Sequence, residues 1–199
     1  MAGKYIEFVN PGYSTLYTRD LKYVKNSSRN DDVDNPFNPD AANPIIEGEW
    51  LQLASGLKAK RGGSATAAAG ANIAVSPCVL HFSERGRYDA QITQKAHVVT
   101  GPQGFEFTCK LGDFTGAAEG EFVFIADFEN PAASGKYIQA LYGADALASA
   151  SSAIATLSAE GSTSAPTAAF WSPGWIVRKV SNSEAVIMFA PQLVPVVHT

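Results

Sequence analysis

The alternation of apolar and polar residues predicts a protein built mainly of β-strands. From residue 45 onward, short apolar or alternating runs are separated by Gly, Pro, Asn and Ser, as expected for strands joined by turns. The predicted strands are 45–53, 77–82, 90–100, 105–111, 121–128, 136–142, 174–180 and 184–190. Many short strands with little helix favour a compact antiparallel β-sandwich or barrel.

Two pairs of neighbouring runs predict β-hairpins. The sequence GPQG at 101–104 separates the alternating runs 90–100 and 105–111, and SNS at 181–183 separates the last two runs. Gly, Pro, Asn and Ser favour the tight turns that join adjacent antiparallel strands. We therefore expect each pair to be neighbours in one sheet.

The first 44 residues have a different character and predict an extended N-terminal arm, followed by a β-domain over 45–199. Pro36, Pro39 and Pro44 each lack a backbone donor and favour an extended residue before them. Aromatic residues recur in this stretch and need a surface to cover them, on a partner or on the chain's own domain: Tyr5, Phe8, Tyr13, Tyr17 and Phe37. An arm reaching a partner and an N-terminal strand folded onto its own domain both fit this pattern.

An insertion rich in Ala, Ser and Thr interrupts the β-domain at about 144–169. Ala favours a helix, and no Pro intervenes before Pro166, but Ser and Thr weaken that tendency. A short helix and a loop therefore both remain open for this segment.

Composition excludes some classes of protein. Hydrophobic residues make up 46% and charged residues 17%, with a net charge of −4. An acidic chain lacks the basic face of a nucleic-acid binder, so we expect no nucleic acid as a partner. No apolar run is long enough for a membrane helix, and the first residues lack the apolar core of a secretory signal. We expect a protein made in the cytoplasm, with no membrane partner.

Candidate catalytic and metal-binding residues form no known pattern. The chain has no GxSxG, GxGxxG or P-loop sequence, and its histidines, His81, His97 and His198, are far apart. Cys78 and Cys109 have no CxxC spacing, so buried thiols are favoured over a disulfide or a zinc site. We expect no enzyme, no cofactor and no metal site.

Charged side chains outside the arm have two interpretations. Glu47 and Glu49 share one face of the predicted strand 45–53, which suits an edge strand that resists unwanted pairing. Arg85 and Arg87 flank Gly86 in a charged stretch, which is typical of a surface loop. The same arginines could hold an acidic neighbour through bidentate ion pairs.

Three segments together resemble the capsid decoration, or cement, proteins of tailed bacteriophages. They are IIEGEWLQL at 45–53, the stretch from ERGRYDAQITQKAHVV at 84–99 into FEFTCKL at 105–111, and GWIVRKVSNSEAVIMF at 174–189. The resemblance covers about half of the chain. Its motifs encode strands and turns rather than chemistry.

This resemblance implies a structural protein on the outer surface of a virion. Its partners would be the major capsid protein and neighbouring copies of itself, in a dimer or trimer, and it would stabilise the assembled shell. The arm aromatics with Arg85 and Arg87 are then the expected capsid or subunit contacts. The alternatives are a minor head, tail or fibre-base protein, or a β-domain that binds carbohydrate or a host surface.

Overall fold

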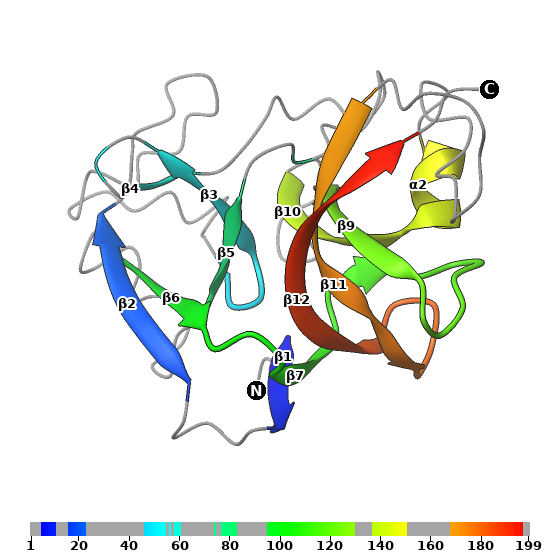
Figure 1. Ribbon diagram of the computed structural model, residues 1–199, viewed down its shortest axis with the longest axis horizontal. Helices are drawn as coiled ribbons and strands as arrows, with labels where there is room; N and C mark the ends of the chain where they lie inside the picture. Colours follow the sequence, from blue (N-terminus) through cyan, green and yellow to red (C-terminus); the bar gives the residue numbers. More distant parts are fainter. Residues whose placement is uncertain are drawn as a thin grey trace.

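The computed structural model describes residues 5–10, 16–22, 46–54, 56, 58–60, 74, 77–82, 95–129, 137–150 and 168–196. Most of this part of the chain is β-structure, arranged in two sheets (Figure 1). The predicted fold class, a mostly antiparallel β-sandwich or barrel, is confirmed. All eight predicted strands are present, with shifted ends.

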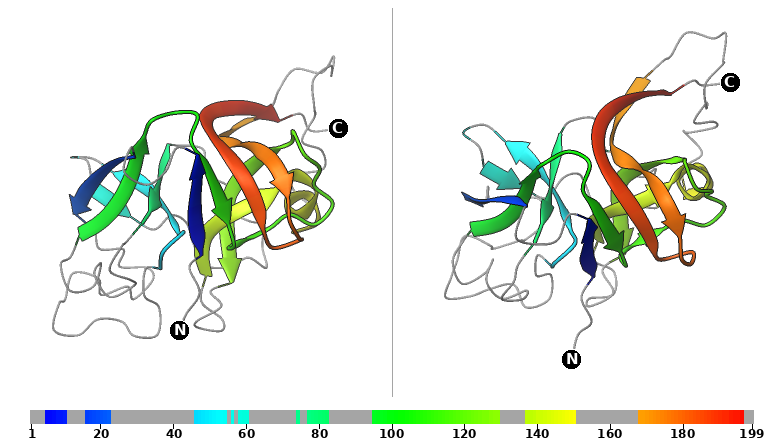
Figure 2. Two further views of the ribbon diagram at one scale, coloured as in Figure 1. Left: turned by 90° about the horizontal axis from the view of Figure 1, so that it is seen from below. Right: turned by 60° about the horizontal axis from the view of Figure 1, so that its bottom comes forward.

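The larger sheet has seven strands in the order β1-β7-β12-β11-β9-β10-β8. Only the short pair β10 and β8 is parallel among the pairings of this sheet. Its members are β1 (Ile6–Asn10), β7 (Glu106–Cys109), β8 (Gly112–Asp113), β9 (Phe122–Glu129), β10 (Tyr137–Gly143), β11 (Ala168–Lys179) and β12 (Ala185–Val196). The long strands β11 and β12 curl across the middle of the molecule (Figures 1 and 2).

The smaller sheet has five antiparallel strands in the order β2-β6-β5-β3-β4. They are β2 (Tyr17–Lys22), β3 (Trp50–Ala54), β4 (Lys58–Lys60), β5 (Cys78–His81) and β6 (Lys95–Gly101). The two edge strands, β2 and β4, also contact each other, so the sheet curls towards a closed barrel. Each strand contributes at least one apolar residue to a buried cluster separate from the main core: Leu21, Leu51, Ala59, Val79, Ala96 and Val98.

The main hydrophobic core lies where the two sheets face each other. Trp50 of the smaller sheet is fully buried against Phe107 and Trp171 of the larger one, with ring centroids 6.2 and 6.1 Å apart. Phe105 stacks on Phe189 at 4.6 Å. Aromatic pairs of this geometry add about 0.5–1.5 kcal/mol each beyond the area that they bury.

A second cluster lies on the outer face of the larger sheet, under the helix α2 (Ala144–Ala150). Leu147 of the helix is fully buried there with Phe124 and Tyr142 of the sheet. Of the two interpretations of the Ala/Ser-rich insertion, the helix holds for residues 144–150. The following residues, 151–167, lie outside the described part of the chain.

The described residues of the predicted arm are strands of the domain itself. β1 pairs with β7 at one edge of the larger sheet, and β2 pairs with β6 at one edge of the smaller sheet. Ile6 and Leu21 are 2% and 4% exposed. The alternative of an N-terminal strand folded onto its own domain therefore holds for residues 5–10 and 16–22, and the boundary at 44 does not separate these strands from their sheets.

The hairpin predicted across residues 101–104 is wrong. β6 lies between β2 and β5, and β7 lies between β1 and β12, so both edges of each strand are already occupied in different sheets. Residues 101–104 instead form a corner that carries the chain from one sheet to the other. Gly104, with φ +85°, turns the chain, and its amide donates to the carbonyl of Phe189. The predicted closing hairpin, by contrast, is present as β11 and β12.

The prediction for Glu47 and Glu49 is also wrong. β3 starts at Trp50 and lies between β5 and β4, so it is not an edge strand. Glu49 is completely buried, and its carboxylate Oε2 accepts a hydrogen bond from the amide of Ile46 at 3.3 Å. Glu49 therefore stabilises the turn before β3 and does not prevent strand pairing at a sheet edge.

Candidate binding surface

The most exposed aromatic side chain described in the structure is Tyr17, at the start of β2. It is 66% exposed, and its neighbour across the strands is Gly101, at the end of β6. The Tyr17 carbonyl accepts a hydrogen bond from the Thr100 hydroxyl at 3.1 Å. The backbone is thus fixed in the sheet while the ring projects into solvent.

Tyr17 belongs to a set of apolar side chains at the corner between the sheets, which we call the corner patch: Val9, Tyr17 and Pro102. Val9 is 51% exposed and lies at a β-bulge of β1, where the register with β7 shifts. Pro102 is half-buried in the corner itself. The end of β1 and the start of β2 lie at the same, lower end of the molecule in Figure 1. The patch therefore lies near the end of β1 and the start of β2, each of which is the last strand in the order of its sheet.

The structure separates the predicted contact residues into different roles. Tyr5 and Phe8 are half-buried and pack against the main core. The ring of Phe8 contacts Phe82 and Phe105 in edge-on arrangements, with centroids 5.2 and 5.8 Å apart. Tyr17 alone of the described predicted residues presents its ring to solvent, whereas Tyr13, Phe37, Arg85 and Arg87 lie outside the described residues.

Val9 and Pro102 were not among the predicted contacts. Val9 follows the alternation Ile6, Glu7, Phe8, in which Ile6 and Phe8 face the core, so a β-strand pattern would place it outward with Glu7. The sequence carries that signal once β1 is recognised as a strand. Pro102 gives no such signal, because its exposure depends on the crossing between two sheets.

The two described histidines, His81 and His97, lie in different environments. His97 and Asp20 face each other across β6 and β2, with Nδ1 2.8 Å from the carboxylate Oδ1, and both are partly exposed. His81 is fully buried, and its Nδ1 lies 2.8 Å from the carbonyl oxygen of Ile46. His198 lies outside the described residues. Within the described part of the chain, no group of three or more His, Cys, Asp or Glu could hold a metal ion.

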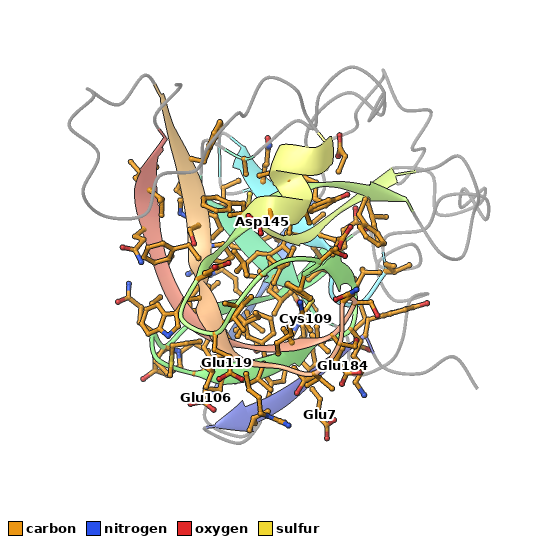
Figure 3. All side chains as sticks on the ribbon, turned by 90° about the vertical axis from the view of Figure 1, so that its right-hand side faces the viewer. Glu7, Glu106, Cys109, Glu119, Asp145 and Glu184 are labelled. Carbon is orange, nitrogen blue, oxygen red and sulfur yellow. The ribbon has the colours of Figure 1, made fainter. Side chains whose placement is uncertain are left out.

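Cys78 and Cys109 are both buried as thiols, as predicted. Burial raises the pKa of each thiol to about 12, because an apolar interior disfavours the thiolate. Figure 3 shows Cys109 in the interior of the molecule. Neither sulfur is available as a nucleophile near neutral pH, since the thiolate is the reactive form.

The described residues therefore present an exposed apolar corner. Among their helices, none is long and apolar enough to cross a membrane. Compared with known proteins, the chain matches no family model, no curated protein and no solved structure.

Proposed function

We propose that the chain is a virion structural protein that binds the outer surface of an assembled phage capsid and stabilises it. Two observations support this. The strand segments around Trp50, β6 and β7, and the closing hairpin resemble those of capsid decoration proteins. The described surface also carries an exposed aromatic ring on a paired β-strand, and tyrosine is enriched among the residues that contribute most to protein interfaces.

The exposure of Tyr17 is the observation that carries the proposal. An aromatic side chain buries about 150–250 Å² in full, so covering the exposed part of Tyr17 removes about 100 Å² from water. At about 25 cal/mol per Å² this contributes about 2.5 kcal/mol per copy, before the cost of association. Covering Val9 contributes a smaller free energy. An arrangement of many copies on one shell multiplies such modest contacts.

The proposed partners are the major capsid protein and neighbouring copies of this chain. The corner patch is the proposed contact with the shell, because Tyr17 and Val9 expose apolar side chains at the start of β2 and on β1. Catalysis has no part in this function.

The experiment compares variants for binding to empty capsids of a candidate phage. Tyr17→Ala removes the exposed ring, and Leu193→Ala removes a side chain of similar exposure, 61%, on β12. We expect Tyr17→Ala to weaken co-sedimentation with shells by about 50-fold, the equivalent of about 2.5 kcal/mol. Leu193→Ala should bind like the unchanged protein. If both variants bind equally well, the corner patch is not the contact.

Copy number distinguishes this proposal from a minor head, tail or fibre-base protein. A decoration protein occupies a repeated position on the shell, whereas a connector is present in few copies. Quantitative mass spectrometry of purified particles measures the ratio of this chain to the major capsid protein. A near-stoichiometric ratio supports decoration, and a ratio of a few copies per particle supports the minor component.

A further inference from the structure

The first two strands of the chain, β1 and β2, are attached to two different sheets. Each is the last strand in the order of its sheet, and each pairs with one described strand, β1 with β7 and β2 with β6. No described pairing joins β1 to β2. Figure 1 shows β2 at the left margin of the molecule and β1 at the lower margin. We call β1 and β2 together the N-terminal strands.

The N-terminal strands fill places in both hydrophobic clusters of the sheets that they join. Ile6 is buried in the main core, and the ring of Phe8 contacts the ring of Phe82. Leu21 is buried in the separate cluster of the smaller sheet. Without these strands, both clusters would lose buried apolar side chains and expose their neighbours to water. Each copy of the fold is therefore complete only when one pair of N-terminal strands is in place.

The chain between the N-terminal strands and the rest of the domain is long enough to reach another copy. Residues 23–45 separate β2 from the next described residue, Ile46. A stretch of that length reaches at most about 75–80 Å when extended, whereas a compact domain of this size is about 40 Å across. No disulfide fastens the strands, since both cysteines are free. The covalent connection therefore allows the N-terminal strands to dock on a neighbouring copy.

The strand pairings have the same energy whether the N-terminal strands come from the same chain or from a neighbour. For this reason, exchange of an identical element is a low-cost route to association between copies. The choice depends on concentration, because a covalent tether typically supplies its own segment at an effective concentration in the millimolar range. In dilute solution each chain keeps its own strands. Where copies are crowded to millimolar local concentration, strands from a neighbour compete.

We propose that crowded copies of this chain exchange their N-terminal strands, with β1 of one copy docking on β7 of the next and β2 on β6. The occupant of these two edges is a second copy because the register is specific: Ile6 lies opposite Cys109, and Leu21 lies opposite Ala96. The inference deepens the proposed function, since it names the contact between neighbouring copies on a shell. Val9 and Tyr17 belong to the exchanged strands, so the corner patch is present in both arrangements.

Disulfide trapping in the full-length free protein tests the exchange. Glu7 lies directly opposite Thr108, and Cα atoms of such pairs are about 4.5–5.5 Å apart, within the range that a disulfide spans. One population carries Glu7→Cys and the other Thr108→Cys, and they are mixed at about 1 mM, the effective concentration of a tethered segment, with a mild oxidant. A disulfide between these positions forms only when β1 of one copy pairs with β7 of another. Mass spectrometry of the cross-linked peptides identifies it.

The matched control mixes Glu7→Cys with Glu119→Cys, which is exposed and lies outside the pairing. Cross-linked dimer should be at least about tenfold more abundant with Thr108→Cys than with this control, because only the opposed pair has disulfide geometry. Its yield should rise with protein concentration. Asp20→Cys mixed with His97→Cys should give the same result for β2 and β6, since these residues are also directly opposed.

A single chain with both Glu7→Cys and Thr108→Cys verifies that the substitutions preserve the pairing, because in dilute solution it should close the disulfide within itself. Exchange is overturned if the mixed populations give no more dimer than the Glu119→Cys control, both under native conditions and after unfolding in urea and refolding together. The experiment contains no shells. Absence of exchange therefore does not count against shell binding through Tyr17, and a failure to bind shells does not count against exchange.

Discussion

Gly174 is the position where one added methyl group should perturb the fold most. It follows a β-bulge of β11, where the register with β12 shifts between Ser172, opposite Gln192, and Gly174, opposite Phe189. Its φ is +153°. The Ser172 hydroxyl donates to the Gly174 carbonyl at 2.9 Å, and the Gly174 amide donates back to that hydroxyl at 3.2 Å. A Cβ at this residue would lie 1.7 Å from the backbone oxygen of Met188.

No side-chain rotation relieves this overlap, because the obstructing atom is backbone of the neighbouring strand. Gly174→Ala must therefore separate β11 from β12, which breaks about two ladder hydrogen bonds at about 1 kcal/mol each. The strained φ adds about 1–3 kcal/mol. The free energy of unfolding should fall by about 4 kcal/mol, which lowers Tm by about 8–16 °C for a chain of this size.

The assay is urea unfolding followed by tryptophan fluorescence, with Gly120→Ala as the matched control. Gly120 also has a positive φ, +88°, but nothing lies within 4 Å of an added Cβ. In the control, the free energy of unfolding should fall only by the cost of a positive φ at a residue with a Cβ, about 1–2 kcal/mol. Equal losses for the two variants would refute the close approach of β11 and β12 at Gly174.

Three further predictions test the assignments of burial. Phe8→Ala should lower the free energy of unfolding by about 3 kcal/mol because its ring contacts the core, whereas Tyr17→Ala should change it by less than about 0.5 kcal/mol; similar losses would contradict these roles. Gln139→Leu should raise stability by about 1 kcal/mol, because the Gln139 amide is fully buried and has no hydrogen-bond partner among the described residues; a destabilised variant would count against that. Cys78 and Cys109 should react with Ellman's reagent at pH 8 only after unfolding, and rapid reaction of the folded protein would show that they are accessible.

The two buried thiols, Cys78 and Cys109, make the free energy of unfolding fall as pH rises. Burial raises their pKa from 9.0 to about 12 in the folded protein, so the unfolded chain releases these protons first as pH rises. Stability from this source is complete below the unfolded pKa and is lost between about pH 9 and about pH 12. Substitution of both cysteines by Ala should flatten the decline over that window, as measured by urea unfolding at a series of pH values.

Local alternation was sufficient to predict eight strands of the β-domain but not their ends, and it missed the short strands β4 (Lys58–Lys60) and β8 (Gly112–Asp113). β11 and β12 extend beyond the predicted runs and contain Pro173, Pro191 and Pro195. Proline normally ends a strand because it cannot donate to the ladder. Here Pro173 lies in the bulge of β11. β7 pairs with β12 only over residues 185–188, so Pro191 and Pro195 lie in the part of β12 that does not pair with β7. These features depend on the sheet as a whole.

Long-range pairing explains why the sequence left two interpretations of the N-terminus open and why the hairpin predicted across the corner was wrong. β1 and β2 are short, and the strands that stabilise them, β7 and β6, follow about 100 and 80 residues later. Polar composition and prolines after residue 30 made the whole stretch resemble an arm. Likewise, GPQG is a typical turn sequence, and only the occupied edges of β6 and β7 show that it joins two sheets.

The candidate contacts were predicted by residue type but not by exposure. Aromatic side chains serve cores and interfaces equally well, so the sequence could not distinguish Phe8, which packs inside, from Tyr17, which projects outward. Trp175 shows the same ambiguity. Its outward direction follows from the cross-strand register with Met188 and from the bulge at Gly174, neither of which a local pattern encodes.

Size-exclusion chromatography with light scattering, on the chain alone and mixed with empty capsids of a candidate phage, tests the proposed function most directly. Capsid decoration predicts that the protein co-migrates with the shells in stoichiometric amounts, and that Tyr17→Ala remains largely in the free fraction. A protein that elutes as a free monomer beside every shell tested would contradict capsid binding.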